Sequence, residues 1–186
     1  YNRYTKQTVN IGSAFLQNEW KNEKWSILLG GRLDKHNLIN HVIFSPRANL
    51  RFNPSEDINL RLSYSSGFRA PQAFDEDLHI ENVGGTVSMI ERAKNLKEEK
   101  SQSFSASADM YHRFGAFQVN FLVEGFYTRL SDVFVLENIG ERDGILIKER
   151  RNGSGAKVLG LSMEGKMAYL SLFQLQAGVT LQQSRN

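Results

Sequence analysis

Apolar and polar residues alternate one by one along most of this chain, and this pattern restricts the folds open to it. Leu60, Leu62 and Tyr64 would share one face of an extended strand, and the residues between them are polar. Successive side chains of a β-strand point to opposite faces, so the pattern predicts strands with one apolar and one polar face. The predicted strands are residues 9–19, 25–35, 46–53, 57–67, 100–113, 116–129, 156–168 and 172–183.

The connections between these strands alternate in length. Short ones suit tight hairpin turns and fall at residues 21–24, 53–57, 112–116 and 168–171. Long ones fall between them, at residues 36–44, 68–97 and 131–156. The alternation predicts an all-β fold, an antiparallel up-and-down meander of about eight strands, with short turns at one end and long loops at the other. Outer-membrane barrels have this asymmetry of turns and loops.

The composition excludes several other classes of protein. Cysteine is absent, so there is no disulfide framework, thiol nucleophile or cysteine metal site. Lys and Arg number 23 against 20 Asp and Glu, and the basic residues form no continuous stripe, so no nucleic-acid partner is expected. No apolar run approaches the roughly 20 residues of a membrane helix. The chain also has no motif typical of a catalytic or metal site, and we expect no enzyme, no cofactor and no bound metal.

A soluble β-sandwich or a lipocalin-like barrel acting as a binding module would also show alternation. Against a small dry barrel stand the many charges on the polar faces: Arg32, Asp34, Arg47, Arg51, Arg61, Asp109, Glu124, Glu164 and Lys166. In favour of a membrane barrel, aromatic residues lie near strand ends, as in interfacial girdles: Trp20, Trp25, Phe52, Tyr64, Phe117, Tyr127 and Tyr169.

We expect one face to contact lipid and the other to line a lumen. The expected lipid-facing residues are Leu29, Leu50, Leu62, Phe121, Leu161 and Val179. The expected lumenal residues are Arg51, Arg61, Asn120 and Glu124.

Residues 60–78, LRLSYSSGFRAPQAFDEDL, join an alternating strand directly to an acidic, aromatic segment. This run resembles the strand-to-loop signature of TonB-dependent outer-membrane receptors. Around it, residues 45–71 resemble the strand, short turn, strand and loop that the family has in succession. Residues 95–111, NLKEEKSQSFSASADMY, resemble the family's re-entry into the next strand, and residues 13–36 resemble an earlier hairpin. The resemblance covers most of residues 13–130.

The resemblance implies a large transmembrane β-barrel of about twenty-two strands in the outer membrane of a Gram-negative bacterium. It also implies an N-terminal plug domain and energy supplied through TonB. We expect residues 1–186 to be part of such a barrel domain, without the plug. The intact receptor would take up a scarce nutrient chelate such as a ferric siderophore, haem or cobalamin. Its expected partners are outer-membrane lipid, the chelate, and TonB through the plug.

The opening stretch supplies most of the candidate ligand-binding residues. Gly67 allows the backbone to turn, and Pro71 lacks an N–H and ends strand pairing. Arg69 could contact ligand or form an ion pair at the barrel rim. The acidic residues that follow could coordinate a cation or form a solvated loop. The candidate residues, in the loops and lumen, are Phe68, Arg69, Asp75, Asp77, His79, Arg61 and Arg51.

A second interpretation is a complete small outer-membrane barrel with a structural or adhesion role, because eight strands suffice for closure. The loop asymmetry suits both membrane interpretations, and the run from Gly67 to Pro71 favours the receptor.

Overall fold

The structure, a computed structural model, describes residues 7–71, 88–142 and 144–185. No helix in this part of the chain is long and apolar enough to cross a membrane. The described residues form these strands: β1 (Ile11–Lys21), β2 (Trp25–His36), β3 (Val42–Ser55), β4 (Ile58–Arg69), β5 (Ser88–Arg92), β6 (Glu99–Phe114), β7 (Phe117–Ser131), β8 (Phe134–Arg142), β9 (Ile145–Asn152), β10 (Ala156–Tyr169) and β11 (Phe173–Arg185).

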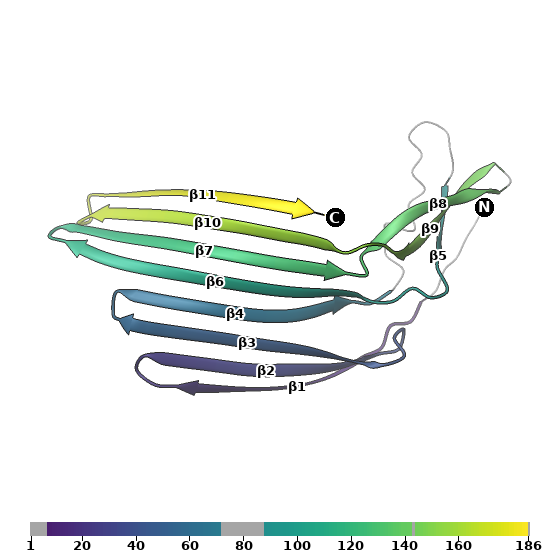
Figure 1. The fold of residues 1–186 in the computed structure, drawn as a ribbon, viewed down its shortest axis with the longest axis horizontal. Coiled ribbons are helices and arrows are strands. Elements are labelled where there is room, and N and C mark those ends of the chain that lie inside the picture. The colour runs from purple at the N-terminus through teal and green to yellow at the C-terminus, as the bar shows by residue number, and fades with distance from the viewer. Residues whose placement is uncertain (1–6, 72–87, 143, 186) are drawn as a thin grey trace.

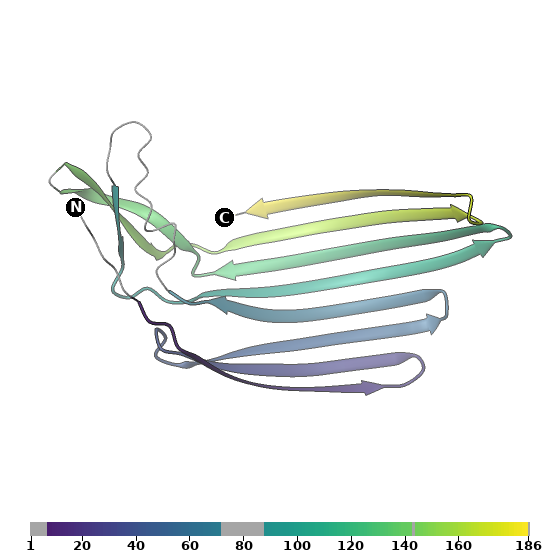
Figure 2. The ribbon, with the colours of Figure 1, turned by 180° about the vertical axis from the view of Figure 1, so that it is seen from behind.

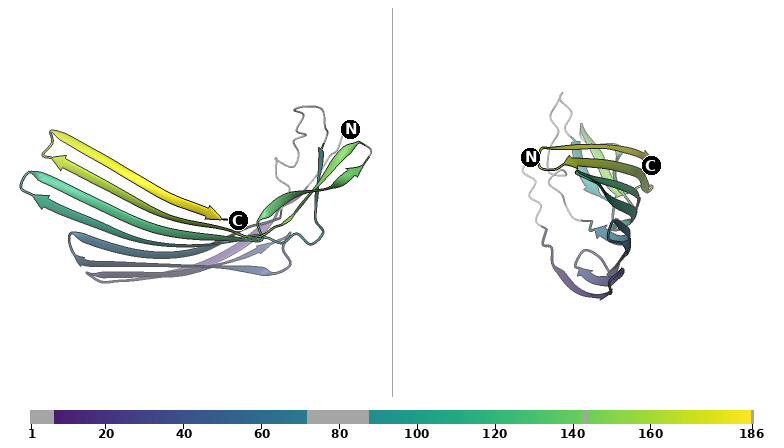
Figure 3. Two further views of the ribbon diagram at one scale, coloured as in Figure 1. Left: turned by 45° about the horizontal axis from the view of Figure 1, so that its top comes forward. Right: turned by 90° about the vertical axis from the view of Figure 1, so that its left-hand side faces the viewer.

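Eight of the strands form one antiparallel sheet in the order β1-β2-β3-β4-β6-β7-β10-β11 (Figure 1). The predicted all-β meander of eight strands is confirmed. Viewed along the strands, the sheet curves as an arc (Figure 3, right). Strands β1 and β11 are its two edges and do not pair with each other, so the described strands do not close into a small barrel.

The register places apolar residues opposite apolar or small residues, and polar residues opposite polar residues, across the sheet. One row joins Leu50, Leu62, Ala106, Gly125, Leu161 and Leu181. The next row joins Arg51, Arg61, Ser107, Glu124, Ser162 and Thr180. Directly opposed residues of an antiparallel pair point to the same face, so the sheet has one apolar and one polar face.

The apolar face is not covered by the described part of the chain. Leu62 is 54% exposed and Leu181 is 61% exposed, although both lie within long strands. Few apolar residues among those described are buried, and they include Ile39, Ile43, Ala70 and Ile147. A soluble sandwich would bury one face of each sheet, so this exposure argues against the soluble interpretation.

Aromatic side chains lie near both ends of the apolar face. Near the short turns, the rings of Phe117 and Tyr169 are 4.7 Å apart. Toward the long loops, Tyr127 lies ten residues after Phe117 in the same strand. Ten residues span about 34 Å along a strand, or roughly 26 Å of height at a tilt of about 40°. This height matches the apolar band of an outer-membrane barrel, about 25 Å tall.

Glycines in the long strands differ in how much space surrounds them. Gly160 in β10 faces the ring of Phe126 in β7, and a Cβ at this position would lie 2.2 Å from a ring atom. A Cβ at Gly125 or Gly165 would have no heavy atom within 4 Å. The Phe126 ring therefore packs where the side chain of residue 160 would otherwise lie.

The two longest predicted loops contain strands of their own, which the sequence did not predict. β8 and β9 form an antiparallel hairpin, and β5 pairs with β9 in parallel, giving a three-stranded sheet. This loop sheet (β5, β9 and β8) extends beyond the ends of the long strands, as Figure 2 shows from behind. The third predicted long loop, residues 36–44, is wrong in length, because β2 continues to His36 and β3 begins at Val42.

Candidate functional site

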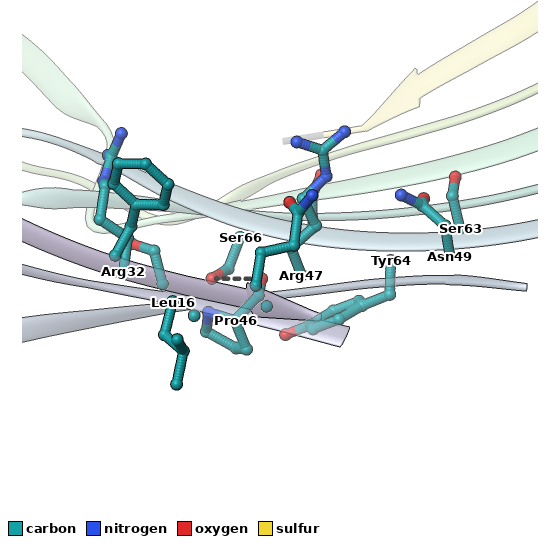
Figure 4. A pocket seen from close by; sticks show the side chains of 14 residues that line it. Leu16, Arg32, Pro46, Arg47, Asn49, Ser63, Tyr64 and Ser66 are labelled. Carbon is teal, nitrogen blue, oxygen red and sulfur yellow. Dashed lines mark hydrogen bonds between the residues drawn. The ribbon is translucent and has the colours of Figure 1, made fainter. Parts of the chain in front are cut away.

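A concavity of about 670 Å³ lies against the polar face of the first four strands. Its lining includes Arg32, Arg47, Asn49 and Ser63, whose side chains point to the same side of the strands (Figure 4). Tyr64 and Leu16 point to the opposite side in that view. Strict alternation along β2, β3 and β4 thus assembles guanidinium, amide and hydroxyl groups on one wall.

Arg51 and Arg61 extend this polar wall toward the short turns and lie directly opposite each other in β3 and β4. The Nε of Arg61 donates a hydrogen bond to Oδ1 of Asn59 at 2.9 Å. The Nε of Arg51 is buried and has no hydrogen-bond acceptor among the described residues. Like charges directly opposite each other are unfavourable in a sheet, so an anion bound beside Arg51 and Arg61 would relieve their repulsion.

The charge of Arg32 is compensated locally. Its Nε donates to Oδ2 of Asp34 at 2.7 Å, and the hydroxyl of Ser13 donates to the other carboxylate oxygen at 2.6 Å. Asp34 is only 2% exposed, and these two donors satisfy its buried carboxylate. By contrast, neither Arg47, Arg51 nor Arg61 has a carboxylate partner in the described part of the chain.

At the rim, where β4 ends, Arg69 forms an ion pair with Glu99 at the start of β6. The Nε of Arg69 is 2.5 Å from Oε2 of Glu99, and its guanidinium lies 5.0 Å from the ring centroid of Phe134. The other carboxylate oxygen of Glu99 accepts a hydrogen bond from the backbone N–H of Phe134 at 2.5 Å. Glu99 therefore ties the ends of β4, β6 and β8 together. The Arg69 side chain stays half exposed, at 51%.

A second charged group lies beside this ion pair. Glu98 is 4% exposed, and its Oε1 lies 3.1 Å from both Nε2 of His41 and Nζ of Lys100. Burial alone would raise the pKa of Glu98. A backbone hydrogen bond at Glu98, the hydrogen bond from Lys100, and the charges of Lys100 and His41 together lower that pKa below its usual value.

Phe68 belongs to the packing at the rim. It is partly buried against a small cluster formed by Ile39, Ile43 and Ala70. Asp75, Asp77 and His79 lie outside the described residues. Of the seven candidate residues, the structure therefore describes Phe68 and Arg69 at the rim and Arg51 and Arg61 on the polar wall.

Sequence reasoning missed the partners that hold the rim. Glu98 and Glu99 were part of the re-entry run at residues 95–111, but nothing in the spacing connected them to His41 or Phe134. Asn152 was also missed. Its side-chain amide donates to the carbonyl oxygens of Lys97 and Asp132, at 3.0 and 2.7 Å, and its Oδ1 accepts from the N–H of Lys97 at 2.8 Å.

The described residues contain no cluster of three or more His, Cys, Asp or Glu side chains that could hold a metal ion. His36 is almost fully buried, and its Nδ1 accepts a hydrogen bond from the N–H of Leu38 at 3.1 Å. Within the described ranges, the chemistry of the site is therefore that of arginine, amide and hydroxyl groups.

An antiparallel sheet with an exposed apolar face, aromatic bands about 26 Å apart and short turns at one end is the wall of a transmembrane β-barrel. The sequence matches the family profile described as TonB dependent receptor-like, beta-barrel, over residues 1–186. The chain belongs to this family, which is a Gram-negative outer-membrane family of transport receptors.

Solved structures agree with this fold. The siderophore receptor PirA from Pseudomonas aeruginosa superposes with a TM-score of 0.72 at 17% identity, over 94% of this chain and 34% of that chain. The ferric enterobactin receptor PfeA, from the same organism, superposes with a TM-score of 0.74 at 18% identity. The match covers 98% of this chain and 28% of that chain. The FrpB iron transporter from Neisseria meningitidis superposes with a TM-score of 0.71 at 16% identity. The match covers 95% of this chain and 26% of that chain. This chain thus spans about a third or less of these receptors. No curated protein matches the sequence.

Proposed function

We propose that this chain forms part of the barrel wall of an outer-membrane receptor that takes up a scarce nutrient chelate with energy coupled through TonB. Family membership and the fold support this proposal. The proposal also places the plug domain outside residues 1–186 and assigns no catalytic step to these residues. TonB would act through the plug and would not contact the wall described here.

The substrate class that the wall fits best is an anionic metal chelate, of which a ferric siderophore is an example. The observation that carries this choice is the set of three arginines without carboxylate partners: Arg47, Arg51 and Arg61. Arginines without carboxylate partners on the wall of a lumen attract anions and repel cations. Haem and cobalamin carry less negative charge and suit this wall less well.

The remaining candidate residues belong to the entrance of the same path. Arg69 is half exposed at the rim, where a second anion contact would precede the wall. Asp75, Asp77 and His79 belong to the segment that follows Arg69, and we assign them to ligand contact in the outer loops. Phe68 would support the rim through its apolar cluster, next to the ligand path.

Transport by the intact receptor tests the proposal. A variant with Arg47, Arg51 and Arg61 all replaced by glutamine should lose uptake of a radiolabelled anionic ferric chelate by at least about tenfold, because each charge contributes to anion attraction. The matched control replaces Lys21, Lys24 and Arg113 by glutamine, which removes the same charge at the short-turn end.

The control should transport normally, and both variants should reach the membrane in equal amounts. Equal uptake by the triple arginine variant and the unmodified receptor would refute the assignment of an anionic chelate. Loss of uptake in both variants would show that total charge, and not the arginine wall, controls transport.

A further inference from the structure

Three basic residues form a row on the apolar face, at the loop end of the sheet. Arg129 in β7 lies directly opposite Lys157 in β10, and Lys157 lies directly opposite Arg185 in β11. By alternation, Arg129 shares its face with Tyr127 and Gly125, so the row lies on the outer, apolar side of the wall and not in the lumen. We call these three residues the basic row.

The basic row carries uncompensated charge. All three side chains are exposed, and none has a hydrogen bond or ion pair with another residue in the part of the chain that the structure describes. Adjacent strands are about 4.8 Å apart, so three like charges lie side by side across roughly 10 Å. Such an arrangement is destabilising unless an anion with several negative charges lies against it.

The height of the basic row corresponds to the boundary of the membrane. Arg129 follows Tyr127, the upper aromatic residue of β7, by two positions, or about 7 Å along the strand. At a tilt of about 40° this places the guanidinium roughly 5 Å above the top of the apolar band. Lipid headgroups lie at that level, and the long loops mark this end as the outer leaflet.

A groove in the apolar face extends from Ile27 in β2 to Leu159 in β10, and its end at Tyr127 and Leu159 adjoins the basic row on the membrane side. It has a volume of about 690 Å³, and its lining is almost entirely apolar. Small residues at Ala106 and Gly125, which are direct cross-strand partners, form its floor. The rings of Phe104 and Tyr127, one row closer to the basic row, border the same groove. A groove of this shape fits a hydrocarbon chain.

We propose that the basic row and the groove together bind one phosphorylated lipid of the outer leaflet. The phosphate groups contact Arg129, Lys157 and Arg185, and an acyl chain lies over Ala106 and Gly125. Guanidinium and ammonium groups are the usual partners of lipid phosphates, and the apolar groove gives the site a preference for lipid over free phosphate. The proposal rests on the outer-membrane location proposed above but not on the transported substrate.

Native mass spectrometry of the intact receptor in detergent, titrated with diphosphoryl lipid A, tests this site. Replacing Arg129, Lys157 and Arg185 by glutamine should reduce bound lipid by at least about tenfold, because each basic residue near a lipid surface contributes measurably to binding. Gly125→Leu should also reduce it, with all charges retained, because the new side chain fills the groove. That substitution should be tolerated, since a Cβ at Gly125 meets no atom within 4 Å.

The control with Lys21, Lys24 and Arg113 replaced by glutamine should bind lipid A as the unmodified receptor does. Phosphatidylcholine and inorganic pyrophosphate should both bind weakly. Unchanged lipid binding in the basic-row variant would overturn the proposal. Tight binding of pyrophosphate together with no effect of Gly125→Leu would also overturn it, because the row would then be a simple anion site. Since the measurement is of binding, its result is independent of whether transport of an anionic chelate is observed.

Discussion

Replacing Glu99 by alanine should loosen the loop sheet while leaving the eight-stranded wall intact. The Glu99 carboxylate accepts a hydrogen bond from the backbone N–H of Phe134, where β8 begins, and pairs with Arg69, where β4 ends. Without the carboxylate, the hydrogen bond from the N–H of Phe134 and the ion pair between Arg69 and Glu99 are both lost. The hairpin of β8 and β9 then keeps only its remaining attachments, such as those of Asn152.

The expected loss of stability follows from how exposed the Glu99 and Arg69 side chains are. The Glu99 side chain is 14% exposed, so its hydrogen bond to a backbone N–H is worth about 1.5–3 kcal/mol. The Arg69 side chain is 51% exposed, and solvent screening limits the ion pair to about 0–1 kcal/mol. The free energy of opening the loop sheet should therefore fall by about 1.5–4 kcal/mol, which corresponds to at least roughly a tenfold faster amide exchange.

Hydrogen exchange of the intact receptor measures this change. Amides of β8 and β9 should lose protection in Glu99→Ala, and amides in the middle of β6 and β7 should not. Glu141→Ala is the matched control, because Glu141 lies in the same hairpin and is exposed. Unchanged protection in Glu99→Ala, or an equal loss in Glu141→Ala, would refute the role assigned to the Glu99 carboxylate.

Three other predictions concern the wall and the rim. Leu62→Arg, near the membrane midplane, should lower the free energy of unfolding measured in refolding titrations by about 2–4 kcal/mol, and Asn120→Arg should lower it far less. Equal losses for the two substitutions would contradict the assignment of the two faces. Gly160→Ala should lower the unfolding temperature, because its Cβ would lie 2.2 Å from the facing ring, whereas Gly165→Ala should not. The folded-state pKa of Glu98 is lowered, so the ionised Glu98 carboxylate stabilises the fold. This stabilisation is complete at pH values above the usual glutamate pKa of about 4.3, and it is lost as the pH falls through the lowered folded-state pKa. Glu98→Gln should remove this acid dependence from the protection of the rim amides.

The eight long strands could be predicted because each residue's environment repeats with period two. Leu62 and Arg61 differ in chemistry because one faces outward and the other faces the polar wall, and this difference is visible in the sequence itself. The loop sheet could not be predicted in the same way. The pairing of β5 with β9 joins residues 88–92 to residues 146–150, and no local pattern indicates a partner so far along the chain.

The candidate site also contains residues that the sequence could predict and residues that it could not. Arg69 was found because it lies within a contiguous run that resembles a family signature, and its neighbour Gly67 marks the departure from the sheet. Its partner Glu99 lies thirty residues later, and the third member, Phe134, contributes a backbone N–H that any residue could supply. A backbone donor carries no residue preference that a sequence could reveal. The side chain of Asn152 is an exception in principle, since an amide that bridges two segments needs its specific donors and acceptor.

The parallel pairing of β5 with β9 makes the two outer loops a single unit for any exchange of loops between receptors. Grafting only residues 70–98 from a relative would bring a strand whose partner has the wrong register, and grafting only residues 132–155 would leave β5 without a neighbour. Either hybrid would present an unpaired strand at the cell surface, which invites proteolysis and non-native pairing. Successful transfer of ligand specificity should therefore require both segments together, and natural recombination should tend to exchange them as a pair.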